Sequence, residues 1–213
     1  MTEEEWRTCS EPGKMLTAIS ASNRKGRLFL CECVRRARVD DELISQVLRM
    51  AELFADGEAT LPERVEPLVA LNAKPEGTWS PLCDLLIESE NSDWVSEGAN
   101  QAVILIGYNS VSGQVAAEAK RQEVVKNEQA SQADVLRDIV PFRPITLDPS
   151  WLTSTVLALA QQMYDSRDFS AMPILADALQ DAGCDNPQIL EHCRGPGPHV
   201  RGCFIVDACL GKV

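Results

Sequence analysis

The chain contains no run of about eighteen apolar residues, the length that a membrane-spanning helix requires. Its beginning also lacks the basic and then apolar pattern of a secretory leader, because Met1 and Thr2 are followed by three glutamates. These two absences argue against a membrane protein or a secreted protein. The sequence therefore predicts a cytoplasmic location.

The motifs of the common catalytic classes are also missing. There is no Gly-x-Ser-x-Gly elbow, no Gly-x-x-x-x-Gly-Lys phosphate loop, no His-Glu-x-x-His zinc motif and no Gly-x-Gly-x-x-Gly dinucleotide loop. The absence of these signatures does not favour an enzyme, and it leaves a binding or scaffold role as the first hypothesis.

Positive charge is scarce, since 20 Lys and Arg residues stand against 32 Asp and Glu residues and the formal net charge is −12. Such a surface repels phosphate backbones and anionic lipids, so neither nucleic acid nor a membrane is favoured as a general partner. Another protein is the partner that remains. Within the first forty residues a basic cluster is interpreted as the solvated face of a helix; it comprises Lys25, Arg27, Arg35, Arg36 and Arg38.

The eight cysteines do not indicate a disulfide framework. Cys9, Cys31, Cys33 and Cys83 occur singly in apolar helical patterns, which is typical of reduced, buried cysteines in the cytosol. With 213 residues the chain can also bury a core without disulfides, as one large domain or two small ones.

Apolar residues recur at helical spacing through most of the chain. The clearest pattern follows Asp40 and Asp41 and ends at Asp56-Gly57, and the first helix begins with a capping-box pattern of Thr2 and Glu5. Residues 103–106 are of β type, but no second β-branched run could pair with them. The sequence predicts an all-α fold, an irregular multi-helix bundle with a compact carboxyl-terminal helical subdomain.

The proline-fixed connector at residues 141–144 predicts a boundary. It separates a helical amino-terminal region, 1–140, from a compact helical subdomain, 141–213, unless the two form one continuous domain. We expect the subdomain to contain helices at about 149–163, 173–182 and 187–193, and a last helix from His199 to Leu210 after the Gly-Pro turn.

Both histidines and three cysteines fall in the carboxyl-terminal hook, residues 184–203, in the order Cys184, His192, Cys193, His199 and Cys203. On the predicted last helix His199 and Cys203 lie four residues apart on one face, so they could share a metal ion. A zinc ion would need two more ligands from Cys184, His192 or Cys193, although adjacent residues such as His192 and Cys193 are hard to aim at one ion. In the simpler interpretation, which the missing Cys-x2-Cys knuckle favours, the histidines cap helices and the cysteines fill the core.

A thiol enzyme is the other chemistry that the hook could support. A histidine could activate a neighbouring cysteine, while Arg194 and Arg201 bind an anionic group. No local thiol-enzyme signature accompanies these residues.

Three segments carry a family resemblance: residues 141–152 (PFRPITLDPSWL), 172–186 (MPILADALQDAGCDN) and 192–203 (HCRGPGPHVRGC). Together with Trp6, Met15-Leu16 and the segment 27–36, they resemble a paralogue-rich protein family of planctomycete bacteria. The resemblance covers most of the chain outside about 75–125. It implies a bacterial lineage and a shared architecture, but no activity and no catalytic residue.

Two functions follow as hypotheses. The first is a non-catalytic protein-interaction or scaffold module, whose helical body presents a groove or an acidic face to a protein partner. The second is a zinc-dependent or thiol-based enzyme or sensor centred on the hook. The sequence favours a protein without a cofactor, and zinc is the one cofactor that it leaves possible.

Overall fold

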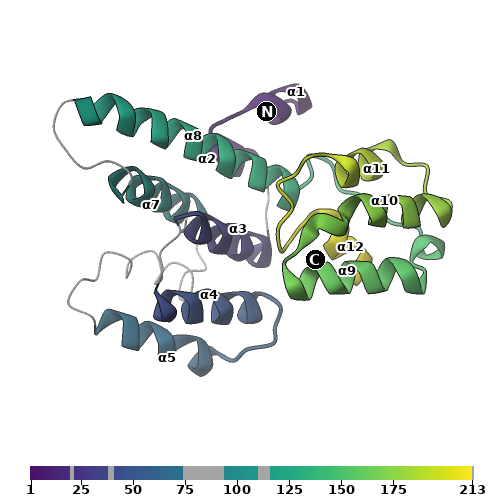
Figure 1. Cartoon of the computed structure of the whole chain (residues 1–213), viewed down its shortest axis with the longest axis horizontal. Helices are drawn as coiled ribbons and strands as arrows, with labels where there is room; N and C mark the ends of the chain where they lie inside the picture. Colours follow the sequence, from purple (N-terminus) through teal and green to yellow (C-terminus); the bar gives the residue numbers. More distant parts are fainter. Residues whose placement is uncertain (20–21, 38–40, 74–93, 110–115, 213) are drawn as a thin grey trace. The chain divides into compact units, whose positions relative to one another are not determined.

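The computed structural model describes residues 1–19, 22–37, 41–73, 94–109 and 116–212. In these ranges every regular element is an α-helix or a 3-10 helix, and none is a strand (Figure 1). The prediction of an all-α, multi-helix fold is confirmed. None of the helices in the described ranges combines the length and the hydropathy that crossing a bilayer would require.

Two compact units make up the chain, Met1–Leu136 and Arg137–Val213. The division falls inside helix α8 (Ala116–Ile139), so the last residues of this helix belong to the carboxyl-terminal unit. It thus precedes the proline connector that the sequence suggested as the boundary. The carboxyl-terminal unit therefore begins with the last residues of α8, Arg137 to Ile139, which precede the connector.

The amino-terminal unit contains, besides most of α8, the helices α1 (Glu3–Thr8), α2 (Pro12–Ala18), α3 (Asn23–Arg36), α4 (Glu42–Ala55), α5 (Leu61–Asn72) and α7 (Trp94–Asn109). The predicted capping box is present, because Thr2 N–H donates to Glu5 Oε2 at 2.6 Å and Glu5 N–H donates to Thr2 Oγ1 at 3.2 Å. The residues of β type at 103–106 lie inside α7. Cys83 and the rest of 74–93 lie outside the described residues.

Helix α3 packs against α4 and α7. Most of its residues from Leu28 to Val34 are buried, which explains the run of apolar residues between its basic ends. Gly98 allows α7 to approach closely, because a Cβ at this position would lie 2.7 Å from Leu30 Cδ1. The absence of a side chain at Gly98 therefore helps to set the distance between the two helices.

Two members of the basic cluster, Arg27 and Arg36, do not form the solvated face that the sequence suggested, and Arg38 lies outside the described residues. Arg27 is only 2% exposed, and its guanidinium lies 5.0 Å from the centroid of the Phe54 ring. Arg36 forms two hydrogen bonds of 2.9 and 3.0 Å to the carboxylate of Glu128 on α8. The interpretation failed because these arginines pair with aromatic and acidic groups of neighbouring helices, which makes their burial tolerable.

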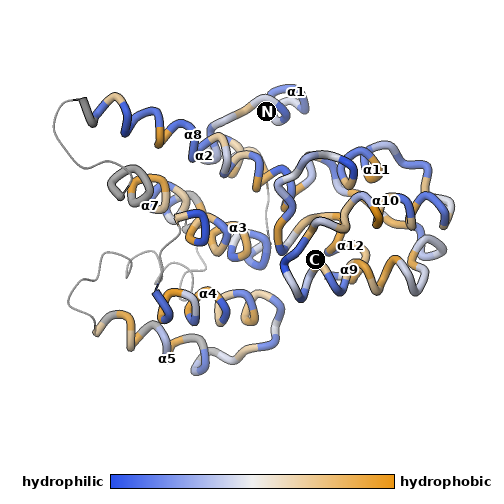
Figure 2. The backbone as a smooth tube through the Cα atoms, in the orientation of Figure 1, coloured by the Kyte–Doolittle hydropathy of each residue, from blue (hydrophilic) through white to orange (hydrophobic). Residues whose placement is uncertain are grey.

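The carboxyl-terminal unit continues with η1 (Pro149–Trp151), α9 (Ser154–Ser166), η2 (Phe169–Ala171), α10 (Met172–Asp181), α11 (Pro187–Arg194) and α12 (Phe204–Leu210). Its core is formed by buried residues from each of the four α-helices. Figure 2 shows hydrophobic and hydrophilic residues alternating along α9 and α10, as expected for helices with one buried face.

The last helix begins later than the sequence predicted, at Phe204 instead of His199. The segment before it is not helical, and Gly197 adopts φ +78°, a left-handed conformation that favours glycine. A Cβ on Gly197 would lie 2.9 Å from the backbone nitrogen of His199. The Gly-Pro turn therefore delivers His199 from a loop, and Cys203 becomes the N-cap residue of α12.

Candidate metal centre

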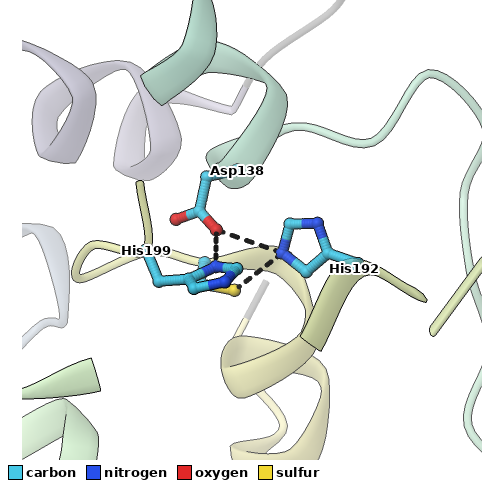
Figure 3. Close-up of side chains that lie close together, drawn as sticks. Asp138, His192 and His199 are labelled. Atoms are coloured by element: carbon cyan, nitrogen blue, oxygen red, sulfur yellow. Dashed lines mark hydrogen bonds and ion pairs between the residues drawn. The ribbon is translucent and has the colours of Figure 1, made fainter. Parts of the chain in front are cut away.

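Four side chains of the carboxyl-terminal unit converge on one point (Figure 3). Asp138 comes from the last turn of α8, His192 from α11, His199 from the loop that follows, and Cys203 from the N-cap of α12. One ligand atom of each residue lies within 4.8 Å of the other three. The group thus joins segments that are far apart in the sequence.

The carboxylate of Asp138 makes most of the contacts in this group. Its Oδ1 atom lies 3.1 Å from His192 Nε2 and 2.8 Å from His199 Nδ1. Its Oδ2 atom accepts a hydrogen bond of 2.8 Å from the backbone N–H of Val200. His192 Nε2 is in addition 3.4 Å from Cys203 Sγ, the sulfur at the end of a dashed line in Figure 3.

The group is shielded from solvent. Cys203 is fully buried, and the side chains of Asp138, His199 and His192 are 2%, 9% and 18% exposed. Burial alone would raise the pKa of Asp138, but the hydrogen bonds and charges of the two histidines outweigh it and lower that pKa. Burial raises the pKa of the Cys203 thiol well above its ordinary value.

Local structure holds both imidazole rings in place. Helix α11 begins with Pro187, and the side chain of its N-cap residue, Asn186, accepts a hydrogen bond from the N–H of Gln188. The ring of His192 packs against Phe204, with centroids 4.3 Å apart, and meets the ring of His199 edge-on at 4.9 Å. Both rings therefore have little freedom to turn away from Asp138.

The four side chains bring a carboxylate oxygen, ring nitrogens of two imidazoles and one sulfur together. His192 Nε2 can carry one proton, yet it faces both Asp138 Oδ1 and Cys203 Sγ. A cation at the centre would satisfy the oxygen, the ring nitrogens and the sulfur together. In a tetrahedral zinc site such atoms are about 3.3 to 3.6 Å apart, as bond lengths of 2.0 to 2.3 Å imply. The three contacts of 2.8 to 3.4 Å would need a small expansion, and atoms of the group that lie up to 4.8 Å apart would need to move closer. With such side-chain adjustment this buried group could hold a metal ion.

The structure brings together three of the five metal ligands that the sequence suggested, namely His192, His199 and Cys203. Cys184 and Cys193 are instead buried in the hydrophobic core of the unit. Proximity of His199 and Cys203 arises from the turn before α12, not from a shared helical face. His192 points to the group while its neighbour Cys193 does not, as expected for adjacent residues of a helix.

Asp138 was not predicted, because it precedes His192, the nearer of the two histidines in the sequence, by 54 residues. A signal was nevertheless present in the sequence. Asp138 interrupts an apolar helical pattern that includes Leu136 and Ile139, and such a buried carboxylate requires a partner. The partners it has are the two histidines.

The two arginines suggested for anion binding have different partners. Arg194 Nη2 donates to Asp177 Oδ1 at 2.8 Å and to Gln180 Oε1 at 2.7 Å. The guanidinium of Arg201 lies 4.3 Å from the centroid of the Tyr164 ring. Arg194 thus contacts residues of α10, and Arg201 contacts a residue of α9.

No family model, no curated protein and no solved structure matches the chain. The resemblance to a planctomycete family therefore stays a prediction.

Proposed function

We propose that the carboxyl-terminal unit binds one Zn²⁺ ion through Asp138, His192, His199 and Cys203, and that the metal stabilises a non-catalytic interaction or scaffold module. The observation that carries the proposal is the convergence of these four ligand atoms within 4.8 Å of one another. Cytoplasmic location and a protein partner belong to the same proposal.

The donor set favours zinc. One thiol and two imidazoles suit borderline-soft transition metals, whereas Ca²⁺ and Mg²⁺ prefer sites made of oxygen atoms. Zinc sites of proteins combine these same ligand types at bond lengths that the group can reach. Copper binds such ligands tightly as well, so the ion bound in the cell also depends on metal availability.

The number of protein ligands supports a structural role for the metal. Catalytic zinc sites keep a position for water or substrate, whereas structural sites have four protein ligands. Here four side chains surround the centre, and even the most exposed of them, His192, is only 18% exposed. A substrate would have to displace a protein ligand to reach the ion.

The thiol-based alternative has less support. Burial raises the pKa of Cys193 to about 12 and that of Cys203 well above its usual value. With a pKa of about 12, the Cys193 thiol remains protonated at neutral pH, and the thiolate is the nucleophilic form. Of the seven cysteines that the structure describes, six are buried, which also limits access to a substrate.

A structural zinc ion would connect the end of α8 with α11 and α12, which lie at different positions in the sequence. Because the unfolded chain does not hold the ligands together, the free energy of metal binding adds to the free energy of folding. Short helices such as α11 and α12 are stabilised mainly by tertiary contacts, and a metal ion would add one such contact between them.

Metal analysis of the purified protein tests the proposal. After expression without added zinc and extensive dialysis, we expect about one zinc per chain, as a structural site retains its metal. The Cys209→Ser variant is a matched control, because Cys209 is a buried cysteine of α12 outside the group. Less than about a tenth of an equivalent in the wild type, with no zinc uptake when the ion is supplied, would overturn the proposal.

A further inference from the structure

The two oxygens of Asp138 have different environments. Oδ1 faces His192 Nε2 and His199 Nδ1, at 3.1 and 2.8 Å. Oδ2 accepts the backbone N–H of Val200 at 2.8 Å, in a bond that is itself buried. Since Val200 directly follows the ligand His199, the same short segment supplies a ligand and fixes the carboxylate.

A carboxylate held in this way offers a metal one oxygen only. Binding through both oxygens would require Oδ2 to leave the Val200 N–H, and a buried N–H without an acceptor is costly. On the basis of the proposed zinc site, we infer that Asp138 is the specificity-determining ligand, which limits the centre to four-coordinate divalent ions by presenting Oδ1 alone.

Charge leads to the same class of ion. A bound metal ion displaces the thiol proton of Cys203, so that with an ionised Asp138 and two neutral imidazoles the ligands carry two negative charges, which a divalent cation neutralises. A buried net charge is expensive, so compensation matters more here than it would at the surface. Asp138 is only 2% exposed and Cys203 is fully buried.

Geometry then separates the divalent ions. Ca²⁺ takes six to eight oxygen ligands and Mg²⁺ requires octahedral geometry with several waters, and neither arrangement can form around three rigid N and S donors and one oxygen. Ni²⁺ favours square-planar or octahedral coordination. Zn²⁺ and Co²⁺ accept a tetrahedral site, and Co²⁺ has a visible spectrum that reports its coordination number.

Cobalt titration of the metal-free wild-type protein is the first test. We expect intense visible absorption of four-coordinate Co²⁺, together with a near-ultraviolet band from the bond to the Cys203 thiolate. Zn²⁺ should displace the cobalt, whereas a large excess of Ca²⁺ or Mg²⁺ should not. The weak visible absorption of six-coordinate Co²⁺, in the presence of the thiolate band, would overturn the inference.

The Asp138→Asn variant is the second test. Asparagine keeps the shape and can still accept the Val200 N–H, but it then presents an uncharged amide to the metal. We expect zinc affinity to fall on the order of 100-fold, because even outer partners of metal ligands contribute 10- to 100-fold. The matched control is Asp134→Asn, an exposed position one turn earlier on α8, which should bind as the wild type does.

Circular dichroism of both variants shows whether they fold, and the cobalt spectrum of the wild type tests the inference without any substitution. A loss of less than about tenfold in folded Asp138→Asn would overturn the role of Asp138. Failure of the proposed function looks different: the wild type would then bind neither zinc nor cobalt and would give no thiolate band.

Discussion

Asp138 Oδ1 and His199 Nδ1 lie 2.8 Å apart, although 61 positions separate the two residues in the chain. The contact connects the end of α8 to the loop before α12, and His192 and Cys203 complete the group. The following predictions treat this group as a zinc site and its surroundings as the structure that supports it.

Serine in place of Cys203 should abolish stable zinc binding. The substitution nearly preserves size but replaces the thiolate, a strong zinc ligand, with a hydroxyl that stays protonated. Zinc content after dialysis measures the effect, and Cys209→Ser on the same helix should retain about one equivalent. Equal zinc contents in the two variants would show that Cys203 is not a ligand.

Chelation should destabilise the carboxyl-terminal unit selectively. A ligand that binds only the folded state stabilises it by about 4 kcal/mol when its free concentration is a thousand times its Kd. Hydrogen exchange should therefore become faster across α11 and α12 after zinc removal. Exchange in α3 and α4 is the internal control; the prediction fails if chelation leaves the rates in α11 and α12 unchanged.

Alanine at Gly197 should weaken both folding and zinc affinity. The left-handed backbone at φ +78° costs about 1 to 2 kcal/mol for a residue with a Cβ, and this Cβ would also lie 2.9 Å from the His199 backbone nitrogen. Gly57 has a similar φ of +73° but open space around it, so Gly57→Ala isolates the conformational cost. We expect the larger loss of unfolding free energy in Gly197→Ala, and unchanged zinc affinity in Gly57→Ala. If the two variants lost equal unfolding free energy and bound zinc with equal affinity, the turn at Gly197 would have no specific role in the site.

Glutamine at Glu128 should destabilise the amino-terminal unit by about 2 kcal/mol, because it removes the charge that pairs with Arg36. The pair is partly exposed, with side-chain exposures of 28% for Arg36 and 8% for Glu128, so the effect should be smaller than for a fully buried pair. Urea unfolding measures it. Glu123→Gln, an exposed position on the same helix, should change stability by less than about 0.5 kcal/mol.

Local sequence patterns were sufficient for much of the fold. The apolar spacing of α4 and the capping box of α1 depend on residues close together in the chain, and both are present as predicted. The location of the last helix was wrong, because the spacing of His199 and Cys203 fitted a helix equally well. The left-handed backbone at Gly197 belongs to a turn instead of a helix, and the residue types alone do not determine the φ angle of a glycine.

The candidate site was predictable only in part. Its two histidines and Cys203 lie within twelve residues, so composition pointed to them. Asp138 belongs to the group through tertiary structure, and choosing it from the 32 acidic residues requires knowledge of the packing. The same limit explains Arg27, whose burial depends on Phe54 from the next helix.

X-ray absorption spectroscopy at the zinc edge, on protein purified without added zinc, identifies the atoms bound to the ion. We expect a first shell of one sulfur at about 2.3 Å and three nitrogen or oxygen atoms at about 2.0 to 2.1 Å. A shell with two or more sulfurs, a shell with none, or a sample without bound zinc would contradict a centre built from Asp138, His192, His199 and Cys203.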